Sequence, residues 1–282
     1  MLLSDFIRRS TSMLSGIYPS LEARGIVLML CQERLGVKSY THIIEPGYEV
    51  TSAVLPRLED DLRRLSAGEP IQYVLGYAEF CGRRFRVCPS VLIPRPETEQ
   101  LVSEAVSFIC DKGRSCRVLD LCTGSGCIAW SVFLESPGTE VVAVDISDEA
   151  LGVARSQFAG ASPRFVKADV LAGGEGFEYG DFDLVLCNPP YVMESEKLAM
   201  RTNVLDYEPG LALFVPDSDP LLFYRAVAVW ARRFLRPDGM GLVEINESLG
   251  PQTAEVFRRA GYKKTRILQD FRSKYRFVMF GD

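Results

Sequence analysis

A glycine-rich turn after a short apolar run is the first feature of the sequence that indicates a ligand-binding site. Residues 117–126 read RVLDLCTGSG, and an apolar helical pattern follows directly. Glycines let a backbone turn sharply and approach a ligand, whose polar groups then meet amides at a helix N-terminus. Asp145 ends the next apolar run, 19 residues after Gly126, where its carboxylate could accept hydrogen bonds from both hydroxyls of a ribose. Together these features predict an adenosine pocket.

The turn does not decide which adenosine cofactor is bound. Gly124, Gly126 and Ala129 also have the spacing of the dinucleotide-binding fingerprint. Asp169, followed by Val170, ends the next strand candidate. An acid at that place can accept the adenine amino group or cap the following turn, and we expect the first role.

The segment NPPY at 188–191 narrows the chemistry, because it follows the apolar run 182–187. Ligands of open α/β sheets bind at the carboxyl ends of the strands, so we expect Asn188 to face the same pocket as the glycine turn. Two prolines in a row fix the backbone around it. A planar NH2 group could donate one hydrogen to the Asn188 side-chain oxygen and the other to the Pro189 carbonyl, while Tyr191 packs against its flat face. The motif predicts a site that recognises a planar amine.

These motifs resemble class I S-adenosylmethionine-dependent methyltransferases that modify planar nitrogen. A narrower resemblance, to the protein-(glutamine-N5) methyltransferases of peptide chain release factors, is carried by several further segments. They are PIQYVLG at 70–76, EFCG at 79–82, VLIPRPETE at 91–99, Glu208-Pro209 and residues 270–276. The resemblance covers nearly the whole chain. The sequence departs from the broad pattern at Cys122, where many class I methyltransferases have glycine.

The resemblance implies S-adenosyl-L-methionine as methyl donor, S-adenosyl-L-homocysteine as product and no metal. It also implies that the substrate is the glutamine of the Gly-Gly-Gln motif of a release factor, methylated on its N5 amide nitrogen and held by a helical N-terminal domain. The residues expected to bind the cofactor are Asp120, Cys122, Thr123, Gly124, Ser125, Gly126, Asp145, Asp169, Val170 and Asn188. The residues expected to bind the substrate and catalyse transfer are Asn188, Pro189, Pro190 and Tyr191.

The apolar periodicity divides the chain into three parts that would position these residues. Residues 1–70 show helical spacing and predict a small helical domain. Residues 71–93 alternate like strands and predict a β-hairpin linker. Residues 94–282 alternate strand and helix, which predicts an α/β, Rossmann-like class I methyltransferase sheet. The strand candidate 276–280 follows 265–268 too closely for a crossover helix, so we expect the last strand to be antiparallel.

The composition excludes several other classes of protein. The chain has 282 residues, 47% hydrophobic and 24% charged, and its apolar runs are far shorter than the roughly 18 residues of a membrane span. Asp5, Arg8 and Arg9 interrupt the stretch where a signal peptide would be apolar, so we expect a cytoplasmic protein. The only histidine is His42, and the eight cysteines include no C-x-x-C pair, which disfavours metal sites and histidine-based catalysis.

The charge distribution bears on the main alternative, an amino-methyltransferase acting on a base of DNA or RNA, since the same motif can read a flipped base. Residues 1–89 carry 11 basic and 10 acidic side chains, whereas residues 90–282 carry 21 and 27. A nucleic-acid enzyme needs a basic face, so we expect no direct nucleic-acid partner. The resemblance implies that the partners are release factors, and we expect a monomer. A second alternative, a nicotinamide-dependent oxidoreductase, would need a catalytic Tyr-Lys or His constellation that is not found in the sequence. A third alternative is a protein that keeps the fold, binds other proteins and has no catalytic activity.

Overall fold

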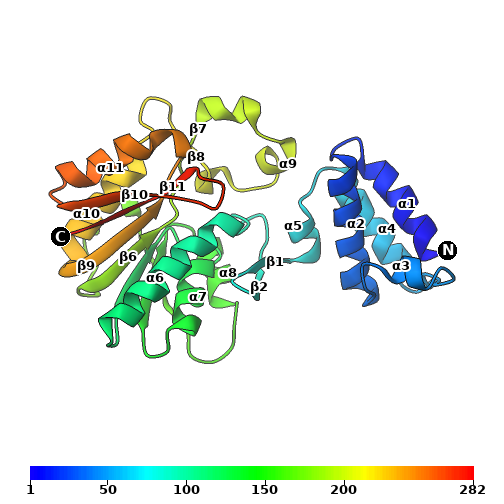
Figure 1. The fold of residues 1–282 in the computed structure, drawn as a ribbon, viewed down its shortest axis with the longest axis horizontal. Helices are drawn as coiled ribbons and strands as arrows, with labels where there is room; N and C mark the ends of the chain where they lie inside the picture. The colour runs from blue at the N-terminus through cyan, green and yellow to red at the C-terminus, as the bar shows by residue number, and fades with distance from the viewer. The chain divides into compact units, whose positions relative to one another are not determined.

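The computed structural model describes residues 1–282 and divides into two compact units (Figure 1). The helical unit contains residues 1–77 together with 201–207, and the sheet unit contains residues 78–200 and 208–282. The segment 201–207 therefore leaves the sheet unit shortly after the NPPY motif and returns to it at residue 208. No helix combines the length and the apolar character that crossing a membrane would require.

The helical unit is built around one apolar core under amphipathic helices. Its helices are α1 Leu3–Leu14, α2 Ser20–Leu35, α3 Thr41–Ile44, α4 Leu55–Ser66, α5 Ile71–Leu75 and α9 Thr202–Leu205. Residues from α1, α2, α4 and α5 form the core, among them Phe6, Leu30 and Leu62. Arg34 of α2 donates to Asp61 of α4 over 2.6 Å and to the Val74 carbonyl of α5 over 3.0 Å. One largely buried guanidinium thus joins three helices.

Helix α5 is where the structure departs from the predicted element boundaries. Residues 71–75 are helical, whereas the sequence predicted the hairpin linker to begin at 71. Gly76, with φ +84°, ends the helix in the left-handed conformation that glycine adopts readily. The hairpin itself is shorter, with strands β1 Tyr77–Phe80 and β2 Arg83–Arg86 around Gly82. Val91 and Ile93 are buried but belong to no strand.

The sheet unit has a seven-stranded sheet in the order β10-β11-β9-β6-β3-β4-β5. The strands are β3 Arg117–Leu121, β4 Glu140–Asp145, β5 Arg164–Lys167, β6 Phe182–Cys187, β9 Leu235–Glu244, β10 Lys264–Gln269 and β11 Tyr275–Gly281. Strands β5, β4, β3, β6 and β9 pair in parallel, and β11 is antiparallel to both β9 and β10. The predicted α/β fold with an antiparallel last strand is confirmed.

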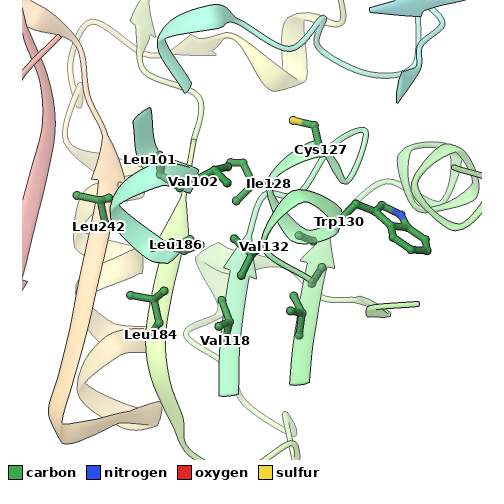
Figure 2. Packing of buried hydrophobic residues seen from close by; sticks show 14 of the residues in the cluster. Leu101, Val102, Val118, Cys127, Ile128, Trp130, Val132, Leu184, Leu186 and Leu242 are labelled. Atoms are coloured by element: carbon green, nitrogen blue, oxygen red, sulfur yellow. The ribbon is translucent and has the colours of Figure 1, made fainter. Parts of the chain in front are cut away.

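Helices bury both faces of this sheet, as a parallel sheet requires. Helices α6 Glu99–Lys112, α7 Cys127–Glu135 and α8 Asp148–Arg155 share one apolar cluster with the sheet. Figure 2 shows Leu101 of α6 and Ile128 of α7 in this cluster with Val118, Leu184 and Leu242 of the strands. Helices α10 Leu222–Phe234 and α11 Gly250–Arg259 share the second cluster.

Short elements complete the unit, and most of them lie on the loops that follow the strands. They are η1 Pro96–Thr98, η2 Val170–Ala172, β7 Val192–Met193, η3 Glu194–Ala199, η4 Gly210–Ala212, β8 Phe214–Val215 and η5 Glu247–Leu249. Strands β7 and β8 pair in parallel and hold the ends of the segment that carries α9. The small sheet of β7 and β8 therefore brings the two ends of this long segment together.

A prediction follows from the close packing of β9 against β11. Gly241 lies opposite Phe280, and a Cβ at 241 would overlap the Phe280 ring, which is itself stacked on Phe257 at 3.9 Å. Gly241→Ala should lower the free energy of unfolding by about 1–3 kcal/mol in urea titrations, as overpacking does. Gly152→Ala is the matched control, since it lies in α8 with nothing within 4 Å of the added Cβ. It should raise the free energy by about 0.5–1 kcal/mol, and equal behaviour of the two variants would contradict this view of the sheet.

Candidate active site

The glycine turn joins β3 to α7 through three residues in the left-handed region. These are Cys122 with φ +59°, Gly124 with φ +54° and Gly126 with φ +79°. A Cβ on Gly126 would lie 3.0 Å from the Cβ of Ala154 in α8, so this glycine allows the turn to pack closely against α8. A Cβ on Gly124 would meet no protein atom within 4 Å, and Gly124 lines a cavity. The two glycines therefore have different tasks, one in packing and one in leaving room for a ligand.

Cys122 takes a backbone conformation that favours the glycine found at this place in many class I methyltransferases. The left-handed conformation costs a residue with a side chain about 1–2 kcal/mol. Cys122 also lines the cavity, beside Thr123. The turn is therefore a strained segment that the surrounding packing holds in place.

Asp145, at the end of β4, is tied to the turn by hydrogen bonds from the backbone. The Gly124 amide donates to Oδ2 over 2.8 Å, and the Ser147 amide donates to Oδ1 over 3.0 Å. Burial raises the pKa of Asp145, and these amides act in the opposite direction. Each carboxylate oxygen keeps a second lone pair. The carboxylate is held rigidly at the cavity wall and can still accept hydrogen bonds from a ligand.

Asp120 lies beneath the turn and is fully buried. The Thr123 hydroxyl donates to its Oδ2 over 2.6 Å. Burial raises the pKa of Asp120 to about 7, because a charged carboxylate loses its hydration there. Asp120 does not line the cavity, so its contact with the turn is through Thr123. The structure places it as a support of the turn.

The cavity has a volume of about 350 Å³ and brings most of the predicted site residues together. Those that line it are Cys122, Thr123, Gly124, Ser125, Asp145, Asp169, Val170, Asn188 and Pro190. Those that do not are Asp120, Gly126, Pro189 and Tyr191.

Asp169 uses Oδ1 to accept the Leu171 amide over 2.8 Å, so it caps η2. Its capping role, one of the two considered from sequence, is present in the structure.

The NPPY motif follows β6 and is held from behind by polar side chains. Asn188 Nδ2 donates to Thr98 Oγ1 over 3.3 Å, and the Tyr191 hydroxyl donates to Glu244 Oε1 over 3.0 Å. Burial, together with Glu244, raises the pKa of Tyr191 well above its usual value. The packing of Tyr191 against the substrate stays a prediction; its hydroxyl is occupied by Glu244, and Tyr191 lies outside the cavity lining. In the structure Tyr191 anchors the motif.

Family models match both units of the chain. The PrmC N-terminal domain matches residues 5–76, and the methyltransferase small domain matches residues 101–206. The chain is 41% identical to the release factor glutamine methyltransferase of Bacteroides thetaiotaomicron, over 98% of each chain. The chain belongs to the release factor glutamine methyltransferase family. The resemblance inferred from the motifs is thereby confirmed.

A second relative agrees with this assignment, and a solved structure shares the fold. The release factor glutamine methyltransferase of Flavobacterium psychrophilum is 33% identical, over 99% of this chain and 98% of the relative. The solved hMettl16 catalytic domain, in complex with the MAT2A 3'UTR hairpin 6, covers 80% of this chain and 81% of its own with a TM-score of 0.53. Its sequence is only 14% identical, so this likeness shows the fold alone.

The structure adds polar residues to this methyltransferase site that the sequence did not single out. Arg95 lines the cavity and donates to Glu208 over 2.7 Å, while the other Glu208 oxygen accepts the Ile93 amide. Thr98 also lines the cavity, and Glu244 lies behind it. The segments that carried the resemblance contain Arg95, Thr98 and Glu208, so the resemblance could have singled out these three residues as part of the site. Glu244 had only one signal, an acid within the otherwise apolar run 240–245.

The buried carboxyl of Asp120 predicts a specific pH dependence of stability. The unfolded carboxyl ionises near its ordinary pKa of 3.8 and the folded one near 7. Between these values the folded chain retains a proton that the unfolded chain has lost, so this group's contribution to stability falls as the pH rises through the window. In Asp120→Asn that loss is absent. Urea unfolding should shift in favour of the variant, relative to wild type, between pH 5 and pH 8, and a pH-independent difference would contradict the burial effect.

Proposed function

We propose that this protein transfers the methyl group of S-adenosyl-L-methionine to the N5 amide nitrogen of the glutamine in the Gly-Gly-Gln motif of peptide chain release factors. One observation carries the proposal. Asn188, suited to recognising a planar amide, lines the same cavity as the glycine turn and Asp145. The similarity to named release factor glutamine methyltransferases along nearly the full chain supports the choice of substrate.

The cavity residues fit the nucleoside part of the methyl donor. Gly124 leaves open space at the cavity wall, and Asp145 offers lone pairs suited to two ribose hydroxyls. Asp169, with one oxygen used in its cap, keeps the other for an amino group. When bound, S-adenosyl-L-methionine supplies a methyl group on a positively charged sulfur. We propose that Asp145 and the turn at 122–126 hold it, and that no metal takes part.

Asn188 and Pro189 provide what a carboxamide nitrogen needs in order to react. Its lone pair is delocalised into the carbonyl, so the nitrogen is a poor nucleophile. The Asn188 side-chain oxygen and the Pro189 carbonyl can accept its two hydrogens, which orients the nitrogen and favours the positive charge that develops on it. The methylated nitrogen then loses a proton readily, so no strong general base is required. Pro190 fixes the backbone that presents both acceptors.

The helical unit is proposed to hold the release factor. It carries adjacent exposed apolar side chains on α3, with Ile43 67% and Ile44 63% exposed, and Tyr40 just before them is also exposed. Apolar side chains gathered on a surface mark sites of protein contact. We further propose that the enzyme acts in the cytoplasm as a monomer and without direct nucleic-acid contact, as its acidic sheet unit suggests.

The experiment that tests the function is methyl transfer from labelled S-adenosyl-L-methionine to a purified release factor, compared with bulk RNA and DNA. The label should appear on the release factor, and mass spectrometry should place it on the Gly-Gly-Gln glutamine. Label in nucleic acid instead would favour the alternative of a base-modifying enzyme.

Asn188→Ala and Asp145→Ala should fail in different ways, because one acts on the substrate amide and the other on the cofactor. Loss of one preorganised contact costs about 3 kcal/mol in the transition state, so Asn188→Ala should lower kcat about a hundredfold and leave cofactor affinity near wild type. Asp145→Ala should weaken S-adenosyl-L-methionine binding by about 1.5–3 kcal/mol in calorimetry. Near wild-type turnover of Asn188→Ala, or unchanged cofactor affinity of Asp145→Ala, would contradict the respective role.

Charging α3 should separate the intact substrate from a short one. The variant Ile43→Lys/Ile44→Lys should raise KM for an intact release factor about tenfold or more, as loss of apolar contacts at an interface does. Methylation of a free Gly-Gly-Gln peptide should not change. Val229→Lys, at an exposed apolar residue of α10, is the control. Deleting the helical unit is a poorer test, because Tyr207 and Arg201 would lose their partners Ala67 and Glu22.

A further inference from the structure

A buried chain of hydrogen bonds lies directly behind Asn188. Asn188 Nδ2 donates to Thr98 Oγ1 over 3.3 Å, and the Thr98 hydroxyl donates to Glu244 Oε2 over 2.7 Å. The other Glu244 oxygen accepts the Tyr191 hydroxyl over 3.0 Å. Thr98 is 2% exposed and Glu244 is 1% exposed. The chain joins η1, the end of β9 and the NPPY motif, which lie far apart in the sequence.

The direction of these hydrogen bonds is set at Glu244. A carboxylate only accepts hydrogen bonds, and a hydroxyl has a single hydrogen to donate. Thr98 gives that hydrogen to Glu244, so toward Asn188 it can act only as an acceptor. Asn188 must therefore present its NH2 group to Thr98. Its side-chain oxygen is then the atom left to accept a hydrogen bond from a group in the cavity that Asn188 lines.

Three nearby groups favour the ionised form of Glu244, which only accepts hydrogen bonds, against the effect of burial. Burial raises the pKa of Glu244, whereas the hydroxyls of Thr98 and Tyr191 and the charge of Arg276 act in the opposite direction. Arg276 is itself fixed by Asp270, at 3.1 Å. A buried carboxyl that has two hydroxyl donors keeps both of its oxygens as acceptors without leaving polar atoms unpaired.

We propose that Glu244 and Thr98 are positioning residues that fix the Asn188 amide with its oxygen toward the substrate, and so select a carboxamide over a carboxylate. The inference rests on the proposed function. With Asn188 held this way, the two acceptors of the proposed function are its side-chain oxygen, at the cavity lining, and the carbonyl of Pro189, the next residue in the chain. Glutamine brings two hydrogens to them. Glutamate brings none, and its charge would face these two acceptor oxygens, while Arg95 at the cavity wall is already paired with Glu208, so the site disfavours it.

Two substitutions break this chain of hydrogen bonds at different points. Thr98→Val removes the hydroxyl, which leaves the Asn188 NH2 group without its acceptor. Glu244→Gln keeps the size of the side chain but introduces a donor at position 244. Thr98 can then accept from that donor and give its own hydrogen to Asn188, which permits the reversed amide orientation. Thr98→Ser keeps the hydroxyl and should restore wild-type behaviour.

The test uses full-length enzymes and two forms of a purified release factor, one with the Gly-Gly-Gln glutamine and one with glutamate in its place. Affinity for each is measured by calorimetry in the presence of S-adenosyl-L-homocysteine, and kcat and KM are measured with the glutamine form. Thr98→Val and Glu244→Gln should each reduce the preference for the glutamine form about tenfold and kcat about 10- to 100-fold, as expected when one preorganised contact is lost. Cofactor affinity should not change.

Controls distinguish positioning from general stability. Thr253→Val makes the same change at a buried hydroxyl of α11 that has no hydrogen-bond partner, and it should retain wild-type kcat and selectivity. In an Asn188→Ala background, Thr98→Val should cause no further loss of release-factor affinity, because the group that it orients is gone. If Thr98→Val fails to fold, Glu244→Gln decides by the same selectivity ratio.

The outcomes separate this inference from the proposed function. If the wild-type enzyme does not methylate the release factor at glutamine, the proposed function fails. If it does, and folded Glu244→Gln and Thr98→Val keep the wild-type selectivity ratio and kcat, only the positioning role of Glu244 and Thr98 is overturned. A further loss from Thr98→Val on top of Asn188→Ala would overturn it in the same way.

Discussion

The parallel register of β4, β3 and β6 is the constraint on which the rest of the site depends. Leu121, at the end of β3, lies opposite Val144 on one side and Cys187 on the other. Neighbouring strands are about 4.8 Å apart, so the loops that begin at 122, 146 and 188 start within two strand spacings of one another. The glycine turn, Asp145 and Asn188 meet because three strands end at the same edge. The apolar strands and the helices on both faces maintain that edge.

Polar groups at this edge are held by partners rather than by solvent. Asp120 has the Thr123 hydroxyl, Asp145 has two backbone amides, and Glu244 has two hydroxyls. A buried carboxyl without such donors would cost several kcal/mol or remain protonated. These donors fix the orientation of the carboxyl groups as well as lowering the cost of burying them, because each donor has a single hydrogen to give. The site is organised before any ligand enters, at some expense in stability at Asp120 and Cys122.

The segment between NPPY and β8 connects the NPPY loop to the helical unit along the chain. Residues 201–207 belong to the helical unit, where Arg201 pairs with Glu22 and Tyr207 donates to the Ala67 carbonyl. The chain returns at Glu208, whose carboxylate binds Arg95 and the Ile93 amide beside the cavity. Both ends of the segment are thus anchored by buried or charged contacts. A unit proposed to hold the release factor is therefore covalently continuous with the loop proposed to read its glutamine.

The sequence by itself determined the elements of the sheet unit and the loops that carry the site. Strands 117–121, 140–145 and 182–187 and the helix after Gly126 are local patterns of apolar residues and turn residues, and the rule on strand ends placed Asn188 and Asp145 on one side of the sheet. The antiparallel last strand followed from the short connection before it. Such features need only neighbours in the chain, so periodicity and spacing are enough to find them.

Tertiary structure alone decided the features that depend on contacts between distant residues. Residues 71–75 became α5 where Arg34 binds the Val74 carbonyl, although the local pattern predicted the start of a hairpin linker. Thr98 and Glu244 meet across 146 residues, and nothing in either local sequence indicates the other. The Tyr191 hydroxyl donates to that same carboxylate, a contact between residues 53 positions apart that neither local sequence indicates, and Tyr191 lies outside the cavity lining. A buried polar group binds whichever partner packing brings within reach, and that depends on the whole fold.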